Sequence, residues 1–168
     1  MIDDFIVDFV CLSKKLVVEV DGAIHDAGGA TILDACREIR RTQYPQGLPT
    51  GEAVITTAGD LPAKHVIHTV GPVYGRHDGQ EAQLLRACYQ NSLSLASRHG
   101  LTSIAFPAIS TGVFGYPQPE AAQTASEIVK SYVLTDDQIR EVRLVFFQLR
   151  SAEIFLEYQK FGGREESI

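Results

Sequence analysis

Residues 103–116 read S-I-A-F-P-A-I-S-T-G-V-F-G-Y, and this stretch decides the fold that we expect. It opens as an apolar run that predicts a buried strand, and its character changes at Pro107. A loop rich in glycine and hydroxyl side chains follows, and a helical pattern begins at Pro117. Glycines let a backbone approach an anion, and the N–H groups of such a loop and helix start point at it. The stretch therefore predicts a phosphate-binding loop, although its spacing matches neither of the two common nucleotide-binding motifs.

Strand and helix patterns alternate along the rest of the chain. Apolar and β-branched runs predict strands at residues 5–10, 16–20, 53–57, 64–70 and 141–147. Helical patterns predict a short helix that starts at Asp21 and ends at Gly28-Gly29, a second helix capped by Thr31, and helices over 81–99, 117–132 and 151–161. This alternation predicts an α/β sheet with helices on both faces, in which ligands sit at the carboxyl ends of strands.

Composition indicates a soluble globular protein of one domain. The chain has 168 residues, 45% of them hydrophobic and 21% charged, with a net charge of −6. The acidic balance argues against DNA as a partner, because a duplex binder normally needs a basic face. No apolar run approaches the length of a membrane span, and the acidic N-terminus is unlike a secretory signal, so we expect a cytoplasmic protein.

The cysteines and histidines give no sign of a metal site. Cys11, Cys36 and Cys88 lack metal-ligand spacing, and we interpret them as reduced thiols. His65 and His68 are three residues apart on a predicted strand, so their side chains should face opposite sides of the sheet. We expect neither a metal ion nor an organic cofactor.

Two further runs join the first in pointing to one family. They are V-D-G-A-I-H at residues 20–25 and G-E-A-V-I-T-T-A-G-D-L-P-A-K-H-V-I-H-T-V-G-P-V-Y at residues 51–74. Together with P-A-I-S-T-G-V-F-G-Y-P at residues 107–117 and the closing strand and helix, they resemble the macrodomain, an ADP-ribose-binding α/β/α module. The resemblance covers roughly residues 20–161. It is strongest to the bacterial branch that deacetylates O-acetyl-ADP-ribose and removes ADP-ribose from acidic side chains.

The resemblance implies a three-layer α/β/α fold with a mixed central sheet. We expect a single macrodomain over residues 1–163, atypical over residues 1–19, and a disordered tail at residues 164–168. The partners implied are ADP-ribose, O-acetyl-ADP-ribose and ADP-ribosylated proteins, and we expect a monomer.

The resemblance also assigns one wall of the ligand cleft to the loop after residue 107. The backbone amides that would wrap the diphosphate belong to Ser110, Thr111, Gly112, Val113 and Phe114. Phe114 and Gly115 would lie against the distal ribose. Phe147 would stack on the adenine, although its position at the end of a strand is also compatible with a purely core role.

The opposite wall would hold the catalytic group. Asp21 matches the family's acidic residue beside the distal ribose, where a carboxylate can orient or activate water while the substrate phosphate assists. Gly22 and Ile24 would contact the ligand next to it. From the residues alone, Asp21 is equally compatible with a helix N-cap, and the two roles can coexist.

The first twenty residues depart from the family pattern. The family reads D-A-I-V-N-A-A-N-x-x-L-x-G-G-G-G-V-D where residues 4–21 read D-F-I-V-D-F-V-C-L-S-K-K-L-V-V-E-V-D. The second Asn of the family, which positions the distal ribose and the water, falls on Cys11. Its glycine run falls on Leu16, Val17, Val18 and Glu19. We also expect the family's first strand, with its adenine-binding Asp, to be missing or altered.

This departure leaves more than one function open. Bulky side chains and the Glu19 carboxylate would crowd the distal ribose and the diphosphate, so the chain is either an ADP-ribosyl ester hydrolase or an ADP-ribose-binding module without turnover. A binder of RNA or poly-purine is a third interpretation, and the acidic net charge counts against it.

A frameshift is one hypothesis that would account for the departure, and a genuinely divergent N-terminus is the alternative. The glycine codons GGT GGT GGA GGT G, read one base late, become GTG GTG GAG GTG, which encodes the Val-Val-Glu-Val of residues 17–20. We therefore expect resequencing of the gene to reveal Asn-Ala-Ala-Asn in another frame upstream of the codon for Asp21. A single uninterrupted frame through the codons for residues 1–20 would instead establish a divergent N-terminus.

Overall fold

The computed structural model describes residues 7–11 and 27–162, and of residues 7–11 it describes the backbone alone. The strand predicted at residues 16–20, the helix start at Asp21 and the tail at residues 164–168 lie outside the described residues.

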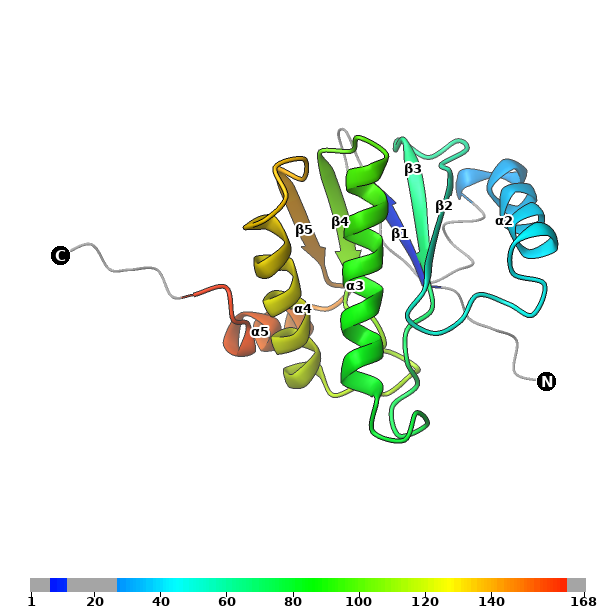
Figure 1. Ribbon diagram of the computed structural model, residues 1–168. Coiled ribbons are helices and arrows are strands. Elements are labelled where there is room, and N and C mark those ends of the chain that lie inside the picture. The colour runs from blue at the N-terminus through cyan, green and yellow to red at the C-terminus, as the bar shows by residue number, and fades with distance from the viewer. Residues whose placement is uncertain (1–6, 12–26, 163–168) are drawn as a thin grey trace.

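The expected alternation of strands and helices is confirmed over the described part of the chain (Figure 1). The strands are β1 (Val7–Cys11), β2 (Ala53–Thr57), β3 (His65–Thr69), β4 (Ser103–Pro107) and β5 (Glu141–Val145). The helices are α2 (Ala30–Thr42), α3 (Glu81–Arg98), α4 (Gln118–Val133) and α5 (Leu149–Tyr158). None of these helices is long and apolar enough to cross a bilayer.

Several boundaries differ by one to three residues from those predicted, and two of the differences have a clear physical reason. Helix α2 has Gly29 at its N-cap and not Thr31, because Gly29 adopts a φ of 73° that only glycine takes easily and the helix starts directly after it. Strand β5 ends at Val145, two residues earlier than expected, and α5 begins at Leu149. The apolar run at residues 144–147 continues past the last strand pair, so hydrophobicity alone places the strand end too late.

The strands form a mixed arrangement, as expected. Strand β3 lies between β1 and β2 and is antiparallel to both, whereas β4 and β5 are parallel. Figure 1 places β4 beside β1, so the two ladders lie next to each other. Among the described residues, β5 has β4 as its one strand partner and forms an edge.

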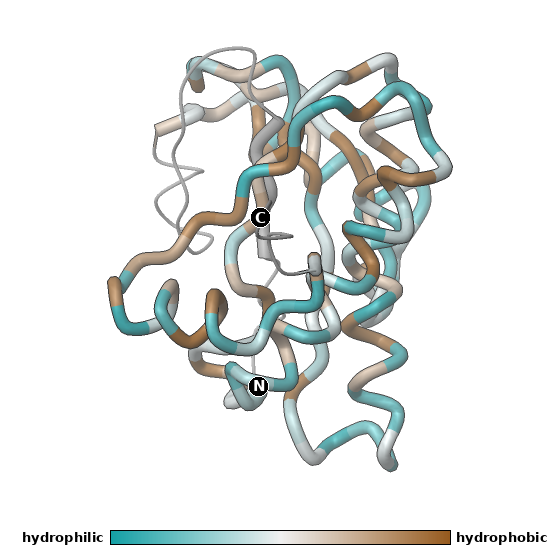
Figure 2. Tube along the Cα trace, turned by 90° about the vertical axis from the view of Figure 1, so that its left-hand side faces the viewer, coloured by the Kyte–Doolittle hydropathy of each residue, from teal (hydrophilic) through white to brown (hydrophobic). Residues whose placement is uncertain are grey.

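Side chains of β3 point alternately to the two faces of the sheet, and helices cover both faces, so the fold has three layers. Ile67 points into a core shared with α3, α4 and the buried side chains of β4, whereas Val66 packs with Ile32 of α2 on the other face. His68 lies on the α2 side, where its Nε2 atom is 2.8 Å from Thr56 Oγ1 and 3.7 Å from Cys36 Sγ. In Figure 2 the helices alternate between hydrophobic and hydrophilic residues, as one buried face requires.

A histidine and a cysteine show how polar groups are placed around the core. The His65 ring lies near the His99 ring at the end of α3, with the centroids 6.0 Å apart, so the two strand histidines do face opposite sides. Burial raises the pKa of the Cys88 thiol to about 11, so this cysteine is a neutral core side chain at physiological pH.

Parallel pairing of β4 with β5 fixes where the site forms. Pro107 pairs with Val145, so both strands end at the same level. The loop that follows β4 and the segment that contains Phe147 therefore leave the sheet at one common edge, as the sequence predicts.

Candidate functional site

The loop at residues 110–115 is folded by its own backbone. The Gly115 amide donates to the Gly112 carbonyl at 3.0 Å, and the Tyr116 amide donates to the Ser110 carbonyl at 2.9 Å. At the start of the loop, the Thr111 hydroxyl donates to the Ala108 carbonyl at 2.8 Å. These bonds close the loop into a compact turn whose tip faces outward.

Ser110 is held in a conformation that few residues adopt. Its φ of 64° lies in the left-handed region, and its side chain is 6% exposed. Its Oγ atom is buried and has no hydrogen-bond partner among the described residues. Strain and an unpaired buried hydroxyl both cost free energy, and such features concentrate at functional sites.

The tip of the loop offers backbone donors. Within the described part of the chain, the amides of Gly112 and Val113 make no hydrogen bond, and both residues are exposed. Helix α4 begins at Gln118, so its positive end lies close to this tip in the sequence. Neutral amides and a helix start can hold an anion without a lysine or arginine, and the loop contains neither.

A second segment braces the loop from behind. A Cβ atom at Gly71 would be 2.3 Å from Ser110 Oγ, so only glycine allows the end of β3 to come this close. The Tyr74 amide donates to the Phe114 carbonyl at 2.9 Å, and the Tyr74 ring meets the Tyr116 ring edge-on at 5.2 Å. Sequence reasoning missed this brace, because the contact to Phe114 comes from a backbone amide that any residue except proline would supply.

Phe147 follows the end of β5 and lies on the surface. It is 82% exposed, whereas its neighbour Phe146 packs against Phe155 in the core with the ring centroids 5.2 Å apart. The core role considered for Phe147 is therefore wrong, and its ring is available at the edge where the loop ends. Val113 at the loop tip is also an exposed apolar side chain, with 88% of its surface accessible.

Comparison with known proteins identifies this arrangement. Residues 15–125 match the family model for the Macro domain. The chain belongs to the macrodomain family. The resemblance seen in the sequence is thus confirmed, and the matched range leaves residues 1–14 and 126–168 outside it.

Several relatives of this macrodomain carry a named activity. The chain is 48% identical over 136 residues to an O-acetyl-ADP-ribose deacetylase of Escherichia coli, covering 81% of this chain and 76% of the relative. It is 48% identical over 145 residues to an O-acetyl-ADP-ribose deacetylase of Cronobacter sakazakii, and this match covers 86% of this chain and 78% of the relative.

Solved macrodomains share the fold. An Oceanobacillus iheyensis macrodomain with ADP superposes with a TM-score of 0.79 at 40% identity, covering 89% of this chain and 77% of that one. A Trypanosoma brucei macrodomain in complex with ADP-ribose gives a TM-score of 0.73 at 34% identity. This match covers 88% of this chain and 58% of the Trypanosoma brucei chain. The predicted α/β macrodomain fold is confirmed.

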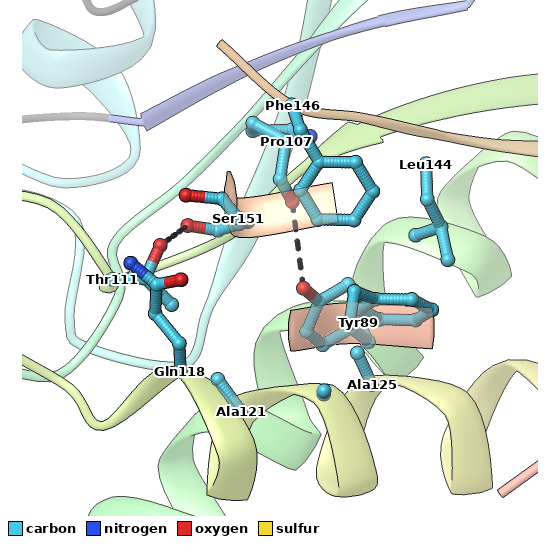
Figure 3. Close-up of a pocket in the computed structure, with 12 residues that line it drawn as sticks. Tyr89, Pro107, Thr111, Gln118, Ala121, Ala125, Leu144, Phe146 and Ser151 are labelled. Carbon is cyan, nitrogen blue, oxygen red and sulfur yellow. Dashed lines mark hydrogen bonds between the residues drawn. The ribbon is translucent and has the colours of Figure 1, made fainter. Parts of the chain in front are cut away.

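A small cavity lies behind the loop of this macrodomain and is distinct from its exposed face (Figure 3). It measures about 20 Å³, enough for about one water molecule and too little for a nucleobase. The polar side chains of Gln118, Thr111 and Ser151 gather at one end, opposite the rings of Tyr89 and Phe146. Gln118 Oε1 is buried without a partner among the described residues, so a water here would satisfy it.

The other predicted wall of the macrodomain cleft lies outside the described residues. This applies to Asp21, Gly22 and Ile24, and to the divergent residues 16–19. The roles assigned to these residues stay predictions. Within the described residues, no group of three or more His, Cys, Asp or Glu side chains could hold a metal ion.

Replacement of Ser110 by glycine should stabilise the ligand-free protein. Glycine adopts a φ of 64° without strain and removes the unpaired hydroxyl, so we expect the free energy of unfolding to rise by about 1 kcal/mol. Chemical denaturation measures this change.

The matched control is Thr111→Gly in the same loop. Thr111 has no left-handed φ and its hydroxyl is bonded, so this substitution should lower stability by about 1 kcal/mol. Equal losses for the two glycine variants would contradict the strain assigned to Ser110.

Proposed function

We propose that this macrodomain binds ADP-ribose across the carboxyl ends of β4 and β5. The observation that carries the proposal is the prepared loop at residues 110–115. It combines unbonded amides at Gly112 and Val113 with the buried, unpaired hydroxyl of Ser110. Among the described residues, each is a donor without an acceptor, and a bound diphosphate would supply acceptor oxygens.

The rest of the ligand would extend from the loop in two directions. The exposed ring of Phe147 offers the adenine a flat apolar surface, and Phe114 with Gly115 would lie against the distal ribose. Solved relatives at 34–40% identity hold ADP or ADP-ribose, which supports this class of ligand for the same fold.

We further propose that the protein hydrolyses an ester at the distal ribose. Substrates would be O-acetyl-ADP-ribose and ADP-ribose attached to acidic side chains of proteins. The Asp21 carboxylate would orient the attacking water and accept its proton, and the ester bond to the ribose would break as the proton returns to the leaving oxygen. The deacetylase names of relatives at 48% identity support this reaction.

A second candidate is an ADP-ribose-binding module without turnover. The observation that favours it is the sequence of residues 16–19, where Leu16, Val17, Val18 and Glu19 replace the expected glycines. Bulky side chains would displace the distal ribose from the attacking water. A carboxylate near the diphosphate would also weaken binding, by an amount that depends on its exposure.

Calorimetry with ADP-ribose tests the binding proposal. We expect saturable binding, and we expect Phe147→Ala to weaken it by roughly tenfold, since stacking of one base on an aromatic ring contributes about 1–3 kcal/mol. Leu149→Ala is the matched control, because Leu149 is also exposed and apolar, and it should bind like the wild type. No heat of binding at millimolar ligand would contradict the proposal.

Release of acetate from O-acetyl-ADP-ribose tests the reaction. We expect Asp21→Ala to lower the rate by about 10²-fold or more, as loss of a general base does. Asp34→Ala should leave the rate unchanged, because Asp34 is an exposed residue of α2 that pairs with Arg37. Hydrolysis unaffected by Asp21→Ala would overturn the catalytic assignment, and tight binding without hydrolysis in the wild type would favour the binding module.

A further inference from the structure

We propose that His77, through the turn at residues 73–80, positions the phosphate-binding loop, and that protonation of its ring weakens ligand binding there. The proposal rests on the proposed function of that loop. It adds a positioning residue that does not contact the ligand. The protonation state of this residue would change the affinity of the site for its ligand.

Contacts of His77 organise the turn. The Val73 amide donates to Nε2 of the His77 ring at 3.2 Å, and the Gln80 amide donates to the His77 carbonyl at 2.9 Å. The His77 amide in turn donates to Glu81 Oε1 at 3.0 Å, and Glu81 is nearly buried in the first turn of α3. His77 thus ties the start of the turn to a fixed helix.

The same turn holds the loop. Tyr74 follows Val73 directly, and its amide donates to the Phe114 carbonyl at 2.9 Å. Its ring contacts the ring of Tyr116, whose amide closes the loop onto Ser110. If Val73 moves, the Tyr74 amide that follows it moves too, and with it the hydrogen bond to the Phe114 carbonyl. Phe114 directly follows the two amides of the loop tip, so these amides would shift as well.

The contact between Val73 and His77 requires a neutral ring. An amide N–H can donate only to an unprotonated ring nitrogen, so Nε2 carries no hydrogen and the ring proton is on Nδ1. Protonation places a hydrogen on Nε2 that faces the Val73 N–H. The acceptor is lost, and the start of the turn must move away.

Among the described residues, two titratable groups packed against the turn keep their charge over the same pH range. Glu81 faces His77 from α3, and its hydrogen bonds hold the pKa of its carboxyl below the usual value of 4.5, so it stays ionised. From the loop side, burial raises the pKa of the Tyr116 phenol, so Tyr116 stays neutral, and Glu120 of α4 lies beyond it. Arg76 and Asp78 belong to the turn itself and are exposed.

The binding test compares pH profiles of variants. ADP-ribose binding to wild type, His77→Gln, His77→Leu and His99→Gln is measured by calorimetry between about pH 8 and about pH 5.5, the interval in which histidine is the side chain suited to act as a switch. A glutamine can place an acceptor oxygen near the position of Nε2 but does not titrate. His99 is an exposed histidine at the end of α3, and it serves as the control.

We expect wild type to bind about fivefold more weakly at the acidic end, as the loss of one net hydrogen bond would produce. His77→Gln should change by less than about twofold over the range, His77→Leu should bind weakly throughout, and His99→Gln should follow wild type. A pH profile of His77→Gln that matches wild type overturns the proposal, because every other histidine, including His25, is present in both proteins.

A ligand-free measurement separates this proposal from the proposed function. In ¹⁵N NMR spectra, the amide resonances of Val73 and Tyr74 should shift together with the His77 ring as pH falls, and should stay constant in His77→Gln. If no variant binds ADP-ribose, the proposed function fails while these spectra still test His77. If the two amides do not follow the ring, the positioning role is wrong whatever the protein binds.

Discussion

The site depends on the parallel pairing of β4 with β5. Because Pro107 stands opposite Val145, two segments separated by nearly forty residues of sequence leave the sheet at the same level. One of them is the strained loop and the other carries Phe147. Shifting this register by one residue would exchange the inward-facing and outward-facing side chains of β5, because side chains alternate along a strand.

An acidic protein can hold an anion without basic side chains, and we propose that the loop at residues 110–115 does so. The chain has a net charge of −6, and residues 110–115 contain no basic side chain. Backbone amides supply the partial positive charge, and a glycine at position 71 lets the neighbouring strand end support them at close range. A site of this kind owes its selectivity to shape and to the number of donors, and little to long-range attraction.

Local chemistry explains which features the sequence could predict. The run at residues 103–116 gave strand, loop and helix in the right order, because proline, glycine and apolar residues act over a few positions. The brace by Tyr74 and the half-buried position of His77 were not predictable, because both depend on which backbone atoms meet in space. For Phe147, the sequence predicted the position after a strand but not the direction of the side chain. Beyond a strand end, the alternation of side chains no longer decides whether the next residue points to the core or to solvent.

The edge formed by β5 has a consequence for how the protein behaves at high concentration. Among the described residues this strand pairs on one side only, and an open strand edge is a template for joining another chain. Glu141 and Arg143 stand on it as an exposed ion pair at 2.8 Å. Such a pair adds little to the free energy of folding. Its charges make the edge costly to desolvate, so they keep neighbouring molecules from extending the sheet into a polymer.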